Sequence, residues 1–202
     1  MRHCIQGKKE PNKNLPELAA AIERKSLHES GKRKAWWPEL MIGFGASLFI
    51  FVLWLSACFA PDIRWLHFFQ SWMYFAAIGL SLRRSRWGYF IGISAAGLWD
   101  YINLFVNSFL RSGLHWLAMW VSTGKLNHPD QIIAVPAWGA NFLVFVDCIC
   151  AYMKLPLKRS RDWFELVFAF VVTTSFFAAA VALFQPRYLP LLRGIIHPHW
   201  PW

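Results

Sequence analysis

Five polar side chains recur every three or four positions along an otherwise apolar segment of the chain. They are Asp100, Asn103, Asn107, Arg111 and His115. At 3.6 residues per turn, this spacing predicts that all five share one face of a helix. Polar groups are costly in a bilayer and usually face a bundle interior or a cavity. We therefore predict that this polar ladder marks a site for a ligand, an ion or a proton.

Two amides from other segments are predicted to lie beside the ladder. Counted at 1.5 Å per residue from the predicted outer ends of their helices, Gln70 and Asn141 lie roughly as deep as Asp100 and Asn103. We expect these four side chains to form one cluster, which the outer members of the ladder connect to the surface. The alternative is that they only hydrogen-bond one another and fix the helix register, at about 0.6 kcal/mol per contact.

Asp100 is the residue that favours a functional interpretation of the cluster. A carboxylate at the centre of a membrane costs about 2.5–3.5 kcal/mol on insertion scales. Arg111 lies about three helical turns further along the chain, which is too far to neutralise it. The hypothesis is that Asp100 binds or relays a proton or a cation.

The elements that must position these residues are membrane-spanning helices. The 202-residue chain is 56% hydrophobic and only 16% charged, whereas soluble domains are about 25% charged. Its apolar residues are concentrated in runs of about 20, the length that crosses a bilayer. We predict five spans, at residues 39–60, 63–82, 87–110, 132–153 and 163–185. The expected fold class is all-α, a polytopic integral membrane helix bundle, because a barrel would show short alternating segments.

The placement of the basic residues predicts the orientation of the bundle. Most of the 21 lysines and arginines lie in residues 1–38, 83–86 and 154–161, which share one side of a five-span topology. By the positive-inside rule, the N-terminus is cytoplasmic and the C-terminus is outside, and we expect a bacterial inner membrane. The net charge of +10 is therefore attributed to topology, and no nucleic-acid partner is expected.

Two polar tails flank the predicted bundle of residues 39–185. Residues 1–38 form a cytoplasmic basic segment in which a short helix is predicted from Asn14 to about Glu29. Three adjacent basic residues are candidates for contact with anionic lipid: Lys32, Arg33 and Lys34. The alternative is a solvated tail. Residues 186–202 form an outer tail, whose His-Pro-His motif is interpreted as an interfacial anchor rather than a metal site.

The connection between the third and fourth predicted spans, residues 111–131, is the longest on the outer side. Residues 114–121 are apolar but too few to cross a bilayer, so they predict an interfacial or re-entrant piece. Alternatively, the third span continues as one long helix to about Val121, despite Gly113.

Small residues predict where helices approach closely. Gly88, Gly92 and Ala96 recur at spacings of four and lead into Asp100, so this edge should face the bundle interior. Gly43 and Ser47 offer a shorter seam of the same kind in the first span.

No motif in the sequence identifies a reaction. There is no Gly-rich phosphate loop, no His-Glu-x-x-His and no nucleophile elbow, and the four cysteines form no Cys-x-x-Cys. No catalytic or metal-binding residue is therefore assigned, and the cofactor is unknown. The first hypothesis is a non-enzymatic subunit or assembly partner of a membrane complex, with lipid and other membrane subunits as partners. The second is a small carrier or channel that uses the cluster around Asp100, and an intramembrane enzyme is third.

Overall fold

Residues 37–190 are the part of the chain that the computed structural model describes. The predicted N-terminal helix, the Lys32–Arg33–Lys34 triplet and the histidines of the C-terminal tail lie outside these residues. All packing described below belongs to one compact unit, which begins at Pro38.

Every regular element among the described residues is helical. The five long helices are α2 (Trp37–Phe59), α3 (Arg64–Leu82), α4 (Arg86–Tyr101), α7 (Ala134–Met153) and α8 (Asp162–Phe184). The shorter elements are η1 (Pro61–Ile63), the π-helical segment η2 (Ile102–Val106), α5 (Phe109–Thr123), α6 (Pro129–Ile132) and η3 (Pro186–Tyr188).

Four of these helical stretches are long and apolar enough to cross a membrane. They are Trp37–Phe59, Arg86–Val106, Pro129–Met153 and Asp162–Phe184, which is consistent with a multi-pass membrane protein. The predicted span at 63–82 also forms a helix, α3, whose 19 residues measure about 28 Å. It is less apolar because it carries Arg64, His67 and Gln70, so a crossing by α3 remains a prediction.

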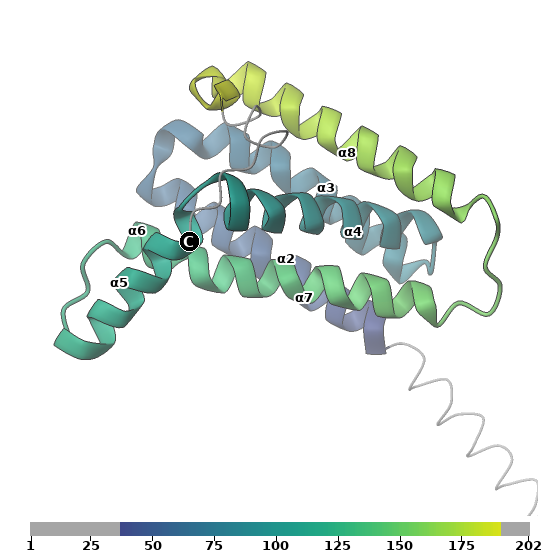
Figure 1. Cartoon of the computed structure of the whole chain (residues 1–202), viewed down its shortest axis with the longest axis horizontal. Coiled ribbons are helices and arrows are strands. Elements are labelled where there is room, and N and C mark those ends of the chain that lie inside the picture. The colour runs from purple at the N-terminus through teal and green to yellow at the C-terminus, as the bar shows by residue number, and fades with distance from the viewer. Residues whose placement is uncertain (1–36, 191–202) are drawn as a thin grey trace, which may run out of the picture. The chain divides into compact units, whose positions relative to one another are not determined.

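Two ion pairs gather helix ends at one end of the bundle. Arg84 Nε lies 3.6 Å from a carboxylate oxygen of Glu39, near the start of α2. Arg86 Nη1, at the start of α4, donates to Asp162 Oδ1 at 2.6 Å, at the start of α8. Successive long helices therefore run in alternating directions, as Figure 1 shows. We call this the Arg86 end, and the opposite end, where α4 gives way to α5, the Asn107 end.

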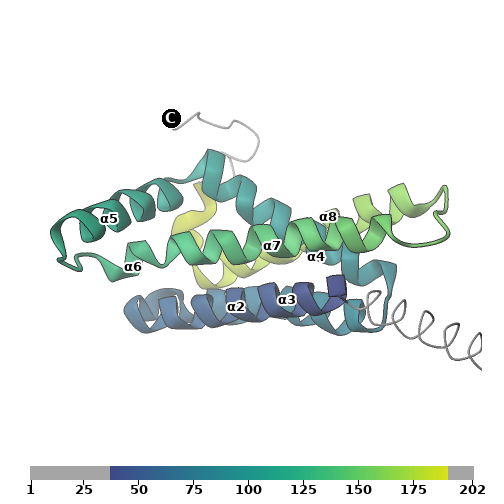
Figure 2. The ribbon, with the colours of Figure 1, turned by 90° about the horizontal axis from the view of Figure 1, so that it is seen from below.

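Helix α4 is the centre of the bundle. It packs against α3, α7 and α8, and nine of its residues are buried. Figure 2 shows α2 and α3 side by side in one layer, with α7, α4 and α8 in the other. The core between the layers includes Ile42, Phe49, Tyr74 and Val144, all with exposed fractions of 0%.

The small residues of α4 allow this close packing. A Cβ added at Gly92 would lie 2.4 Å from Cys148 Sγ on α7, and one at Gly88 would lie 2.4 Å from the backbone nitrogen of Ser81. Ala96 is completely buried. The predicted small-residue edge of this helix therefore does face the bundle.

The predicted seam in the first span is wrong. No atom of a neighbouring helix among the described residues lies within 4 Å of a Cβ added at Gly43, and Ser47 is exposed. Gly45 instead faces α7, where an added Cβ would lie 3.1 Å from the Ala140 carbonyl oxygen. Residues two apart lie on very different sides of a helix, and spacing alone does not tell which side meets a neighbour.

The third span is shorter than predicted. We expected a helix over 87–110, or a continuous one to Val121, but α4 passes into the π-helical segment and the chain becomes extended at Asn107 (φ −120°, ψ 171°). The Asn107 side chain explains the break, because its Oδ1 accepts a hydrogen bond from the Phe109 N–H at 3.1 Å. Such local bonds compete with helix formation. The predicted apolar piece at 114–121 lies within α5.

We predict that Gly92→Ala destabilises the protein by about 1–3 kcal/mol, because the new methyl group overpacks the contact between α4 and α7. Thermal unfolding of the purified protein in mild detergent measures the effect. Combining it with Cys148→Ala should restore part of the loss, since the clashing sulfur is removed. The control is Gly79→Ala, which faces open space among the described residues. Equal melting temperatures for the two glycine variants would contradict the packing argument.

Candidate functional site

The break at Asn107 divides the polar ladder, so the prediction of one continuous helical face is wrong. Asp100 and Asn103 are buried, with exposed fractions of 7% and 4%. Asn107 is half-buried at the break, and Arg111 and His115 are exposed on the separate helix α5. The sequence contained the relevant signal in Asn107, whose side chain favours local turns, but the 3.6 periodicity obscured it.

A buried network links α3, α4 and α7 through the side chain of Asn141. Its Nδ2 donates to Asp100 Oδ1 at 3.1 Å and to the Ala96 carbonyl at 2.9 Å. Its Oδ1 accepts a hydrogen bond of 2.6 Å from the Tyr74 hydroxyl. We call these residues the Asn141 network. Both Asn141 and Tyr74 have exposed fractions of 0%, so the network is closed to solvent.

Tyr74 is a member of this network that the sequence reasoning missed. Gln70, one turn earlier on α3, was the residue from this helix that was expected in the cluster with Asn141. The available signal was the residue type, because a buried tyrosine hydroxyl usually finds a hydrogen-bond partner. Gln70 instead lines a pocket, and its Oε1 is buried without a hydrogen-bond partner among residues 37–190.

Asp100 is only partly satisfied in this arrangement. Its Oδ1 accepts from Asn141, whereas its Oδ2 is buried and has no hydrogen-bond partner in the described part of the chain. No lysine, arginine or histidine among the described residues forms an ion pair with it. An unpaired acceptor in a low-dielectric core is costly. Asp100 Oδ2 therefore has unused capacity to accept a hydrogen bond.

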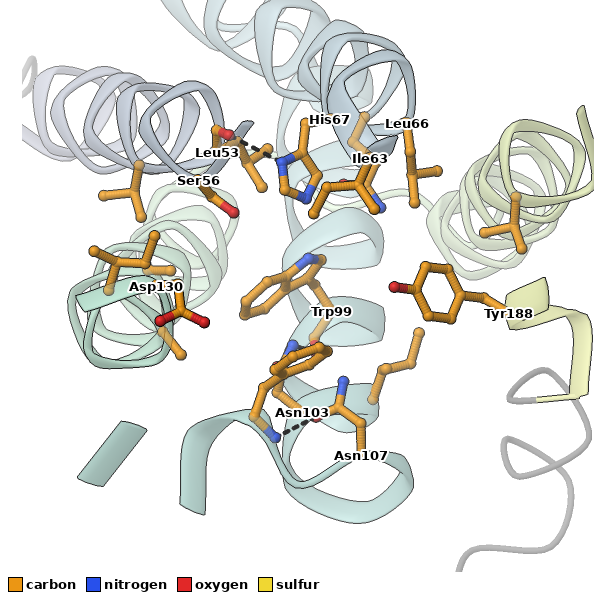
Figure 3. A pocket seen from close by; sticks show the side chains of 18 residues that line it. Leu53, Ser56, Ile63, Leu66, His67, Trp99, Asn103, Asn107, Asp130 and Tyr188 are labelled. Carbon is orange, nitrogen blue, oxygen red and sulfur yellow. Dashed lines mark hydrogen bonds between the residues drawn. The ribbon is translucent and has the colours of Figure 1, made fainter. Parts of the chain in front are cut away.

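A pocket of about 220 Å³ lies at the Asn107 end, between α2, α3, the end of α4, α7 and η3 (Figure 3). Most of its wall is apolar, from residues such as Leu53, Leu66, Ile102 and Val181. Its remaining polar and aromatic lining consists of Ser56, His67, Gln70, Trp99, Asn103, Asn107, Phe109, Asp130 and Tyr188. Three predicted site residues therefore line it: Gln70, Asn103 and Asn107. The other four do not: Asp100, Asn141, Arg111 and His115.

Local hydrogen bonds fix the direction of several pocket groups. His67 Nδ1 lies 2.9 Å from the Leu53 carbonyl, which can only accept, so Nδ1 carries the hydrogen. The other ring nitrogen faces the pocket (Figure 3) and is an acceptor in the neutral ring. Asn107 uses its Oδ1 for Phe109 N–H, and its NH₂ donates to no group within residues 37–190. The pocket thus presents several hydrogen-bonding groups in an apolar wall, as ligand sites do.

A second polar cluster, at the Arg86 end, was also missed. Asp162 accepts from Arg86 Nη1 at 2.6 Å, from the Tyr152 hydroxyl at 3.1 Å and from the Arg159 N–H at 2.9 Å. These bonds tie α4, α7 and α8 together. Arg86 was predicted only as an interfacial charge, because pairing across helices is not visible in sequence spacing.

No protein-family model, curated protein or solved structure matches this chain. The site must therefore be interpreted from its own geometry.

We predict that Tyr74→Phe destabilises the protein by about 1–3 kcal/mol, because it leaves the buried Asn141 Oδ1 without its donor. Thermal or denaturant unfolding in detergent is the measurement. Thr173→Val is the matched control, since Thr173 is equally buried but its hydroxyl has no hydrogen-bond partner within residues 37–190. If both variants were equally stable, the Asn141 network would not contribute to the fold as argued.

Proposed function

We propose that this chain is a non-enzymatic, multi-pass membrane protein that binds a small amphipathic molecule in the pocket at the Asn107 end. The observation that carries the proposal is the pocket itself, with an apolar wall and hydrogen-bonding groups from several helices. Such concave, mostly apolar sites with few polar groups are the usual form of small-molecule sites. This corresponds to the carrier hypothesis, centred on Gln70, Asn103 and Asn107 rather than on Asp100.

The charge distribution supports a bilayer as the surroundings and gives the proposed orientation. The turn with Arg83 and Arg84 and the 154–161 loop lie at the Arg86 end, where Arg86 pairs with Asp162. By the positive-inside rule this end faces the cytoplasm. With α3 counted as a crossing, five helices span the membrane, and the pocket faces outside. A bacterial inner membrane is the proposed location.

The packing below the pocket favours a closed binding site over an open channel. Phe49, Tyr74, Ala96 and Asn141 each have an exposed fraction of 0% and come from α2, α3, α4 and α7. A continuous aqueous path would have to pass between these side chains. A carrier mechanism therefore requires a second arrangement of the helices.

The pocket chemistry favours binding over catalysis. A serine nucleophile needs a hydrogen-bonded base, and that base is oriented by a third group. Within residues 37–190, His67 is oriented by the Leu53 carbonyl, and no hydrogen bond joins it to Ser56. The enzyme hypothesis is therefore the weakest of the three.

Filling the pocket should abolish ligand binding. Ser56 points into the pocket from the last turns of α2 (Figure 3), so Ser56→Phe should occupy it. We expect native mass spectrometry of the protein from mild detergent to detect a bound small molecule in the wild type. Ser56→Phe should lose this mass, whereas Ser47→Phe, at an exposed site on the same helix, should retain it. Equal retention by both variants would contradict the proposal.

A second candidate function, as a subunit of a membrane complex, is favoured by α5. This helix rests on α6 and α7 through Gly113, where an added Cβ would lie 2.7 Å from the Gln131 carbonyl oxygen. Its other sides expose large apolar side chains, among them Leu114, Trp120 and Val121, with exposed fractions of 45%, 42% and 77%. These residues offer a surface to a second membrane subunit.

This subunit hypothesis predicts co-migration with another polypeptide on native gels after mild solubilisation. The double variant Leu114→Gln and Val121→Gln should remove the partner without lowering the melting temperature, because both side chains are already exposed. The matched control is Phe164→Gln on α8, whose side chain is 75% exposed away from α5. Migration of the wild type alone would contradict the subunit hypothesis and leave the pocket proposal standing.

A further inference from the structure

The charged side chains that line the pocket indicate whether its ligand is a cation, an anion or neutral. Among the described residues that line the pocket, Asp130 is the only acidic or basic one apart from His67. Figure 3 shows its carboxylate directed towards the space beside Trp99. Among the described residues, the lining therefore supplies no lysine or arginine to pair with an anion such as a carboxylate or phosphate group.

No lysine or arginine among the described residues forms an ion pair with the Asp130 carboxylate. Its ion-pair partner among residues 37–190 is His128 Nδ1, at 4.0 Å, rather than a lysine or arginine. Arg187 does approach the pocket, because it donates to the Tyr188 hydroxyl at 3.2 Å. Its guanidinium is paired with Asp62, however, so these two charges offset one another.

The remaining groups suit a cation with an apolar body. An indole ring such as that of Trp99 attracts a cation near its face. His67 Nε2, which faces the pocket, is an acceptor for a hydrogen of an ammonium group. The aliphatic wall formed by residues such as Leu66, Ile102 and Val181 accommodates the carbon chain.

We propose that the pocket is selective for a small organic cation, an alkylammonium whose charged group lies between the Asp130 carboxylate and the Trp99 ring. This inference rests on the proposed function, because it names the class of molecule that the pocket takes. It assigns Asp130 as the residue that determines specificity.

Three six-carbon probes with different head groups test the proposal: hexylamine, which is cationic at neutral pH, 1-hexanol and hexanoate. Each is titrated calorimetrically into the full-length protein in mild detergent, with a detergent blank subtracted. Hexylammonium should bind about tenfold more tightly than hexanol, and hexanoate should bind most weakly. Asp130→Asn should weaken hexylammonium binding about tenfold and leave hexanol binding unchanged.

Two further variants separate the possible failures. Glu165→Gln removes a carboxylate at the Arg86 end, where it pairs with Arg161, and should leave all three affinities unchanged. Ser56→Phe should abolish binding of every probe. Cation selectivity is overturned if Ser56→Phe abolishes binding but hexanol or hexanoate binds the wild type as tightly as hexylammonium does. It is also overturned if Asp130→Asn has no effect on hexylammonium binding. In both cases the pocket proposal survives. If no probe responds to Ser56→Phe, the proposed function itself fails.

Discussion

The side chain of Asn141 is the interaction on which the rest of the bundle depends. In the fully buried layer between α3, α4 and α7, it donates to Asp100 and Ala96 and accepts from Tyr74. Because a buried amide without partners is costly, these helices have one favourable register in which all its bonds form. Apolar contacts between helices in lipid give little directional preference, since lipid tails are equally apolar. The network therefore supplies the specificity that hydrophobic packing lacks.

That register places the break at Asn107 above the closed layer, which creates the pocket. If α4 continued as an ideal helix, Asn103 and Asn107 would lie on one ridge. The π-helical segment Ile102–Val106 instead shifts the helix face, and the extended Asn107 turns the chain into α5. Irregular backbone at membrane depth is tolerated where it lines a cavity or is buried in protein. The break is thus both a departure from regular structure and the origin of the candidate site.

Sequence periodicity predicted the helices well because length and apolar content are local properties. Four predicted spans correspond to apolar helices, and the Gly88–Gly92–Ala96 edge faces the interior. It failed for the seam at Gly43 and for the ladder beyond Asn103, where a side-chain bond to the backbone outweighed the periodic pattern. The roles of Tyr74 and Asp130 could not be predicted. Contacts between helices depend on how each helix is rotated and shifted against its neighbours, and local sequence patterns do not contain this information. The expected four-residue cluster accordingly divides between the Asn141 network and the pocket.

The buried polar groups of the bundle differ in how completely they are satisfied. At the Arg86 end, the buried carboxylate of Asp162 has three donors, and such complete pairing is what a structural role requires. Towards the Asn107 end, Gln70 Oε1 and Asp100 Oδ2 are buried without hydrogen-bond partners among residues 37–190. A fold selected only for stability would gain by pairing or removing them, since unsatisfied buried acceptors cost about 1–3 kcal/mol each. Proteins often violate such local rules at functional sites, but buried atoms without partners also occur towards the Arg86 end, among them Glu39 Oε2 and Asp147 Oδ2. What distinguishes Gln70 is that it also lines the pocket. The pocket, rather than the unpaired groups alone, therefore indicates the Asn107 end as the functional half.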